Sequence, residues 1–131
     1  MPCRYVIDKE QKLILSVGWD RVSSLEIQEH RNQLAGDPEF NPDFDQLVDG
    51  TAVTGLDVSM DDAKLIASAT VFSPVSRRAF VASNLLILGV TRMMETYAHI
   101  GKGREQVKVF HDRNEAMKWL GLQTLPTIVT R

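Results

Sequence analysis

The chain has 131 residues, a formal net charge of -2 and 44% hydrophobic residues, with a single cysteine. This composition predicts one soluble domain that builds its core without disulfides or a structural metal. The near-neutral charge argues against nucleic acid as the main partner, because phosphate binding is normally accompanied by net basicity. The apolar runs are too short to span a bilayer and the N-terminus lacks a signal-peptide pattern, so we expect a cytoplasmic location.

Five short runs of β-forming residues predict five strands. They are residues 5–7, 13–17, 46–49, 78–82 and 106–110. The first two flank a polar stretch of hairpin length, which predicts an antiparallel pair. Residues 18–20 are expected to end the second strand, and residues 50–58 are expected to form a loop after the third.

Capping patterns predict four helices between and after these strands. Ser23 with Glu26 three residues later is typical of a capping box and predicts a helix over residues 24–35. Ser59 with Asp62 repeats that spacing, with Leu65 and Ile66 expected to face inward. The remaining helices begin near Asn84 and Asp112, and they end at Gly101 and Gly121.

The predicted order is therefore β-β-α-β-α-β-α-β-α in one α/β domain, residues 1–121, followed by a C-terminal tail, residues 122–131. Strands that alternate with helices favour a mixed, mostly parallel five-stranded sheet packed with four helices. The first strand is expected to be antiparallel at or near an edge. Binding sites in such sheets usually lie at the carboxyl ends of the strands.

With this element order, residues 47–59 (LVDGTAVTGLDVS) and 76–82 (SRRAFVA) resemble the SpoIIAA-like group of the STAS superfamily. The resemblance extends over nearly the whole chain and implies a STAS-type fold in a bacterial protein. The superfamily includes antagonists of anti-sigma factors, which implies a non-enzymatic regulatory or protein-interaction module. The architecture also resembles Sec14-type lipid-binding domains, which implies, as an alternative, a small carrier of an apolar or lipid-like anionic ligand. An uncharacterised enzyme is the third hypothesis.

The resemblance also implies candidate regulatory residues. Asp49 and Asp57 match two acidic positions of the sigma-regulating members, in which a phosphorylated serine begins the second helix. Val58 occupies the hydroxyl position here, and Ser59 follows it. Ser59 is therefore interpreted as a helix cap, with regulated phosphorylation as the alternative.

Other candidates come from the basic pair Arg77 and Arg78 and from Ser83 and Asn84. One arginine is expected to pair with an acid such as Asp49 or Asp57 and the other to be solvated; the alternative is recognition of a carboxylate or phosphate. Ser83 and Asn84 begin a helix directly after a strand, where backbone donors favour an anion. We expect the acidic residues 57–62 and the basic pair to meet at one end of the sheet.

The helix predicted to begin near Asn84 carries Met93 and Tyr97, which either pack in the core or line an apolar pocket. Its all-round apolar start makes a homodimer one candidate assembly. The three histidines lack metal-ligand spacing and no nucleophile motif is present, so no metal, cofactor or catalytic residue is predicted. A closed apolar cavity would favour the carrier, and a packed core would favour the interaction module.

Overall fold

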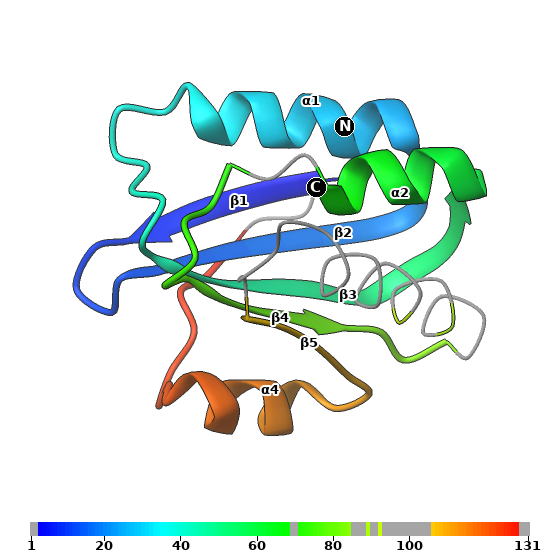
Figure 1. The fold of residues 1–131 in the computed structure, drawn as a ribbon. Coiled ribbons are helices and arrows are strands. Elements are labelled where there is room, and N and C mark those ends of the chain that lie inside the picture. Colours follow the sequence, from blue (N-terminus) through cyan, green and yellow to red (C-terminus); the bar gives the residue numbers. More distant parts are fainter. Residues whose placement is uncertain (1–2, 69–70, 85–88, 90–91, 93–105, 129–131) are drawn as a thin grey trace.

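A five-stranded sheet in the order β1-β2-β3-β4-β5 organises the protein in the computed structural model, which describes residues 3–68, 71–84, 89, 92 and 106–128 (Figure 1). β1 at the edge is antiparallel to β2, and the other neighbours are parallel, as predicted. The strands are β1 (Cys3–Asp8), β2 (Leu13–Ser23), β3 (Asp45–Asp57), β4 (Arg77–Val81) and β5 (Gln106–Phe110).

Helices cover both faces of this sheet (Figure 1). α1 (Ser24–Ala35) and α2 (Met60–Ser68) lie on one face, and α4 (Arg113–Leu120) lies on the other. Three helices are thus described, where four were predicted. Most of the predicted helix that begins near Asn84 lies outside the described residues, as do Met93 and Tyr97.

Local capping explains where the described helices begin and end. Ser23 Oγ accepts from the Glu26 backbone N–H, and Glu26 accepts in return from the Ser23 N–H, which confirms the predicted capping box. Asp112 caps α4 through the Asn114 N–H, and Gly121 ends it in the left-handed region at a φ of 72°. These boundaries follow from residues adjacent in the sequence.

Two predicted strand ends were wrong. β2 does not end at residues 18–20 but continues to Ser23, with shifts of register between Val17 and Trp19 and between Asp20 and Arg21. Residues 50–57 are not a loop, because they extend β3 alongside the second half of β2. At these irregularities both strands bend, and the pairing between β2 and β3 continues beyond them.

The two faces of the sheet differ in composition. On the α4 face, Leu15 of β2 and Leu47 of β3 pack in an apolar cluster with Ala79 and Leu120. The residues adjacent to these in each strand point to the α1–α2 face, because side chains alternate. Ser16, Gln46 and Arg78 therefore occupy that face, next in sequence to Leu15, Leu47 and Ala79.

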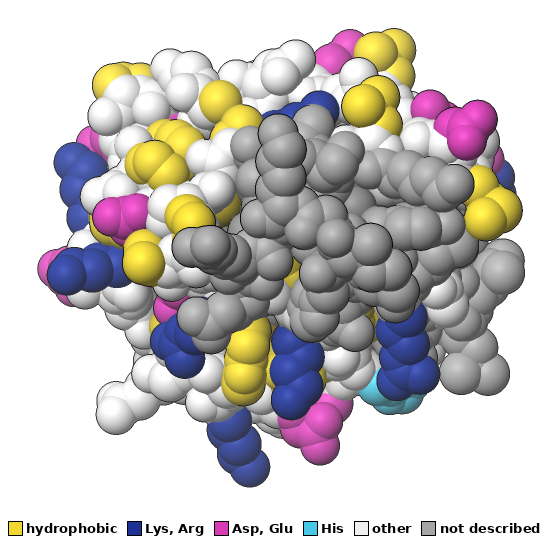
Figure 2. Space-filling view, in the orientation of Figure 1, with side chains coloured by type: hydrophobic (Ala, Val, Ile, Leu, Met, Phe, Trp, Pro, Cys, Tyr) yellow, Lys and Arg dark blue, Asp and Glu magenta, His cyan; other side chains and the backbone are white. Residues whose placement is uncertain are grey.

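The outer surface of the α1–α2 layer carries apolar side chains among charged ones (Figure 2). Leu25 of α1 and Met60 and Leu65 of α2 are exposed. Leu65 was expected to face inward, but 55% of it is exposed. Among the α2 side chains that the structure describes, Ala63 and Ile66 turn inward, because Ala63 is buried and Ile66 lines a cavity below the helix.

Candidate functional site

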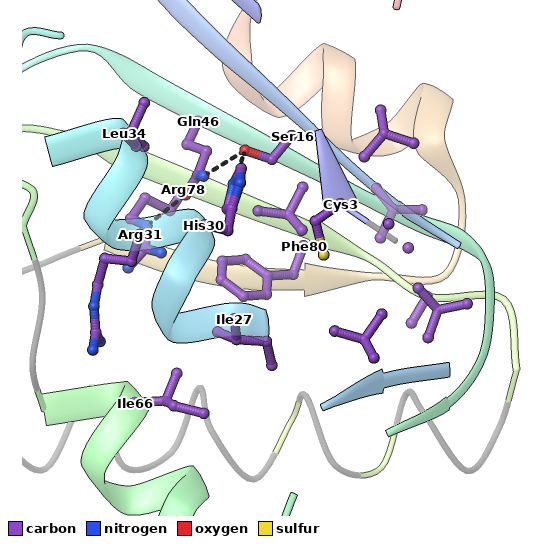
Figure 3. Close-up of a pocket in the computed structure, with 18 of the residues that line it drawn as sticks. Cys3, Ser16, Ile27, His30, Arg31, Leu34, Gln46, Ile66, Arg78 and Phe80 are labelled. Atoms are coloured by element: carbon purple, nitrogen blue, oxygen red, sulfur yellow. Dashed lines mark hydrogen bonds between the residues drawn. The ribbon is translucent and has the colours of Figure 1, made fainter. Parts of the chain in front are cut away.

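A cavity of about 170 Å³ lies between the sheet and the α1–α2 layer (Figure 3). Its floor comes from β2, β3 and β4, and α1 covers it with Ile27, His30, Arg31 and Leu34. Most of the described lining is apolar. The lining includes Val22, Ile27, Leu34, Val48, Val53, Leu56, Ile66, Phe72 and Phe80.

A chain of hydrogen bonds crosses one wall of this cavity (Figure 3). Arg78 Nε donates to Gln46 Oε1 at 3.0 Å, and Gln46 Nε2 donates to Ser16 Oγ at 2.9 Å. Ser16 Oγ lies 3.0 Å from His30 Nε2 on α1. Ser16 and Gln46 are each only 3% exposed, so these bonds offset the cost of burying polar groups.

His30 connects the sheet to α1 at the end of this chain. Its ring meets Tyr5 edge to face, with centroids 5.4 Å apart. Burial lowers the pKa of His30, because the charged imidazolium loses its hydration. Within the described part of the chain, His30 Nδ1 is buried without a hydrogen-bond partner.

The neutral form of His30 also fits the hydrogen-bond geometry. Gln46 fills one lone pair of the Ser16 oxygen, so donation of the hydroxyl proton to His30 Nε2 gives that proton an acceptor. This arrangement places the imidazole proton on Nδ1. The pair has the spacing of a nucleophile and a base, but no acidic residue among the described ones bonds Nδ1 to orient it.

Arg78 supplies positive charge to the cavity wall. Its guanidinium lies 4.6 Å from the ring centre of Phe72 and 5.3 Å from that of Phe80. Arg31 also lines the cavity, but its side chain extends away from Ser16 and Gln46 (Figure 3). The described residues that line the cavity include neither Asp nor Glu.

Arg77 has a separate role on the opposite face of the sheet. Its guanidinium donates to the carbonyls of Trp119 at 2.8 Å and Leu120 at 3.1 Å, and it pairs with Asp45 at 3.0 Å. The prediction that one arginine pairs with an acid is thus confirmed, but its partner is Asp45 and not Asp49 or Asp57. Arg77 holds the last carbonyls of α4.

Asp57 and Ser59 lie away from the two arginines. β3 and β4 are parallel, and Arg78 pairs with Gln46 near the start of β3, whereas Asp57 is its last residue. The expectation that these groups meet at one end of the sheet was therefore wrong. Asp57 forms an exposed ion pair with Arg21, and Ser59 Oγ accepts from the Asp62 N–H, as predicted for a cap.

The carboxyl ends of β4 and β5 form a second polar cluster with the middle of β3. Asp49 is 7% exposed, accepts from Thr51 N–H and Oγ1, and pairs with Arg113 at 3.2 Å. Ser83 Oγ donates to the Thr51 carbonyl at 3.1 Å, and the Ser83 carbonyl bonds the His111 ring at 3.2 Å. Asn84 follows Ser83 at the surface. The cluster is consistent with a structural link between β3 and α4.

Sequence reasoning missed Ser16, Gln46 and the role of His30. A signal for them exists, because central strands of a parallel sheet are buried on both faces. A polar residue inside such a strand must then find a buried partner. Ser16 interrupts the run Leu13–Val17 and Gln46 begins the run before Leu47, so both could have been recognised as buried polar groups.

The described residues contain no group of three or more His, Cys, Asp or Glu side chains placed to hold a metal ion. Within the same residues, no helix is long and apolar enough to cross a membrane.

No protein-family model matches the sequence, and no curated protein sequence matches it. A solved structure is similar: an uncharacterized protein of the DUF3478 family from Shewanella loihica PV-4, described as having a SpoIIAA-like fold. The two are 22% identical over 90% of this chain and 93% of that chain, with a TM-score of 0.53. The chain therefore has a SpoIIAA-like α/β fold, in agreement with the resemblance of residues 47–59 and 76–82.

Proposed function

We propose that this protein binds a small molecule with an apolar body and an anionic head group, in the cavity beneath α1 and α2. The observation that carries this proposal is the contrast within the cavity wall. Apolar side chains make up most of its described lining, and a cationic Arg78 stands at one side. Pockets of this kind, mainly apolar with a few placed polar groups, are typical of small-molecule sites.

The hydrogen-bond chain supports the same proposal. Gln46 fixes the Nε side of the Arg78 guanidinium, and Phe72 and Phe80 lie against it. A cation held in this way is already oriented, so less conformational entropy is lost when an anion binds. Ser16 and His30 hold Gln46 in turn, which makes them positioning residues for Arg78.

Native mass spectrometry of freshly purified protein tests the proposal, with the cavity-blocking variant Ile27→Trp beside the wild type. Ile27 lines the cavity from α1. We expect bound mass on the wild type and none on Ile27→Trp. Leu25→Trp is the matched control, because Leu25 lies on the same helix but is 64% exposed. It should retain the bound mass.

A wild type that is empty after purification is next incubated with a panel of amphipathic anions. Absence of bound mass after that step would overturn the proposal. Equal binding by wild type and a folded Ile27→Trp variant would also overturn it, because the ligand would then lie elsewhere. Circular dichroism establishes that each variant is folded.

The protein-interaction module remains a prediction. The STAS-type switch depends on a hydroxyl at the start of α2, and Ser59 there serves as a cap for the Asp62 N–H. A pull-down from lysate with wild type and Ser59→Glu tests this hypothesis, and a specific partner for only one form would support it.

A further inference from the structure

We infer that protonation of His30 at mildly acidic pH detaches α1 from the sheet and speeds the release of a bound ligand. This inference rests on the proposed function and adds a means of controlling it. Three features support it: the direction of the hydrogen bonds that end on His30, the position of His30 on the helix that covers the cavity, and the groups around its ring.

The hydrogen bonds of the polar chain run in one direction and end on His30. Arg78 Nε donates to Gln46, and Gln46 Nε2 donates to Ser16 Oγ. The Ser16 hydroxyl then donates its proton to His30 Nε2, 3.0 Å away. Because Nε2 is the last acceptor, the closed chain requires the neutral imidazole with its proton on Nδ1.

A second proton on the imidazole removes that last acceptor. Nε2–H would then donate to Ser16 Oγ, which already accepts from Gln46, and the Ser16 proton would need another acceptor. Ser16 is 3% exposed, so water has little access to it. His30 Nδ1–H has no partner in the described part of the chain, and in the charged ring it shares the positive charge. Burial of the imidazolium at this position is therefore unfavourable.

His30 joins α1 to the sheet at the part of the helix that covers the cavity. Its side chain reaches from α1 to Ser16 on β2 (Figure 3). Ile27 and Leu34, about one turn before and after it, line the cavity from the same side of the helix. The imidazolium regains its hydration by moving away from Ser16, so its protonation favours a state in which α1 is displaced and the cavity is uncovered.

The groups around His30 leave it as the one that gains charge near neutral pH. The described charged or titratable side chains on the elements around it are Cys3 and Tyr5 of β1, Glu26, Glu29 and Arg31 of α1, Asp37 after α1, and Arg78 of β4. The Glu26 carboxylate already accepts from the N-cap residue of α1. Burial raises the pKa of Cys3, and burial together with the hydrogen bond to Asp37 raises the pKa of Tyr5 to about 12. Hydrogen bonds from a backbone N–H and from Tyr5 lower the pKa of Asp37, so none of these three changes charge at mildly acidic pH.

Linkage sets the size of the effect. Burial lowers the pKa of His30 in the closed state, whereas a detached His30 returns to the ordinary value of about 6.5. If only the detached state takes up the proton, its population rises about twofold between pH about 7.5 and 6.5, and about tenfold between pH about 7.5 and 5.5. Tenfold is the upper limit, because protonation of the closed state below its own lowered pKa reduces the gain.

Hydrogen–deuterium exchange of the purified full chain tests the detachment and needs no ligand. Exchange is measured at pH about 7.5, 6.5 and 5.5, with correction for the intrinsic effect of pH on amide exchange. The amides of α1 should lose up to about tenfold in protection at the lowest pH. The amides of α4, a short helix on the other face, exchange by local opening that does not involve His30 and should keep their protection. Equal losses in both helices would overturn the inference, because the whole chain would then be unfolding.

Two histidine variants assign the effect. His30→Gln keeps an acceptor for the Ser16 proton but takes up no second proton, so the protection of α1 should no longer depend on pH. His111→Gln is the matched control, because His111 is exposed after β5 and bonds the Ser83 carbonyl. It should behave like the wild type. A pH effect that persists in His30→Gln or disappears in His111→Gln would overturn the inference. If His30→Gln does not fold, the wild type still decides, because equal protection of α1 at the highest and lowest pH would overturn it.

Native mass spectrometry then connects the detachment to the ligand. The bound mass is followed over time while wild type and His30→Gln are dialysed against ligand-free buffer at the highest and lowest pH. Its loss should be up to about tenfold faster at the lowest pH in the wild type and independent of pH in His30→Gln. Release at equal rates from a wild type whose α1 does detach would overturn the link to the ligand.

The outcomes separate the two proposals. Bound mass on a protein whose α1 protection does not change with pH would overturn this inference and leave the proposed function standing. Absence of bound mass, even after incubation with the panel of amphipathic anions, would overturn the proposed function and the release of a ligand. The exchange measurements would still decide whether His30 detaches α1.

Discussion

The two faces of the sheet are built from alternate residues of the same strands, yet they perform different tasks. Leu15, Leu47 and Ala79 pack against α4, whereas their neighbours Ser16, Gln46 and Arg78 form a polar chain beside a cavity. The α4 face buries apolar surface and stabilises the fold. The α1–α2 face contains buried polar side chains and a cavity, so it contributes less apolar burial to stability. Binding sites commonly have lower stability in this way.

The largest expected effect lies on the α4 face. Leu47 is 0% exposed at the centre of its apolar cluster. Leu47→Ala should lower the free energy of unfolding by about 2–5 kcal/mol, because it removes buried methyl groups and leaves a void. Val48→Ala, at the next residue and on the cavity wall, should cost less. Urea denaturation measures the free energy of unfolding of both variants. An equal loss in the two would contradict the difference between the two faces of the sheet.

The second prediction concerns the polar chain. Gln46→Leu removes the acceptor of Arg78 Nε and the donor to Ser16, and it should cost about 1–3 kcal/mol of unfolding free energy. Adding Arg78→Met should recover part of this loss, because the Nε–H that Gln46 had accepted from is also removed. A double-mutant cycle measures the coupling, and strictly additive losses would contradict the chain.

The third prediction compares two helix caps. Ser23→Ala and Asp112→Ala should each lower the free energy of unfolding by about 1 kcal/mol, since each removes one capping acceptor. Only Ser23→Ala should reduce the mass that the purified protein binds, because Ser23 caps the helix that covers the cavity. Urea denaturation and native mass spectrometry of both variants provide the measurements. A loss of bound mass in Asp112→Ala alone would show that the ligand lies on the α4 face.

The smallest effect is a pH dependence that arises from His30. Burial lowers its pKa in the folded state, so below pH about 6.5 the unfolded state binds more protons. The free energy of unfolding should therefore fall as the pH decreases from about 7.5 to about 5.5, until the pH passes the lowered pKa of the folded state. His30→Gln should flatten this slope in chemical denaturation curves. An unchanged slope would contradict the lowered pKa.

The sequence predicted those parts of the fold that depend on near neighbours. The capping box of Ser23 and Glu26 and the end of α4 at Gly121 need only residues within one or two turns, and both are confirmed. The continuation of β2 past Gly18 could not be predicted in this way. It depends on pairing with residues 50–57, distant in the sequence, and on Asp20 in the left-handed region at a φ of 56°.

The site was only partly predictable for the same reason. Arg78 was recognised as a candidate, but its acceptor Gln46 lies opposite it on the neighbouring parallel strand, β3. The register between β3 and β4 places Gln46 beside Arg78, and the packing of α1 on the sheet then brings His30 to Ser16. Neither arrangement is visible in the sequence. The acidic residues 57–62 were predicted to meet the basic pair, but Asp57 is at the end of β3 and Arg78 pairs near its start.

The contact between Arg77 and α4 has a consequence for tolerance to mutation. Its two acceptors in the helix, the carbonyls of Trp119 and Leu120, are main-chain atoms that every amino acid possesses. Substitution at those positions alters the apolar packing but leaves the acceptors in place, whereas a chain shortened before them loses both. The attachment of α4 to Arg77 should therefore tolerate substitutions at positions 119 and 120, but not a truncation that removes these residues.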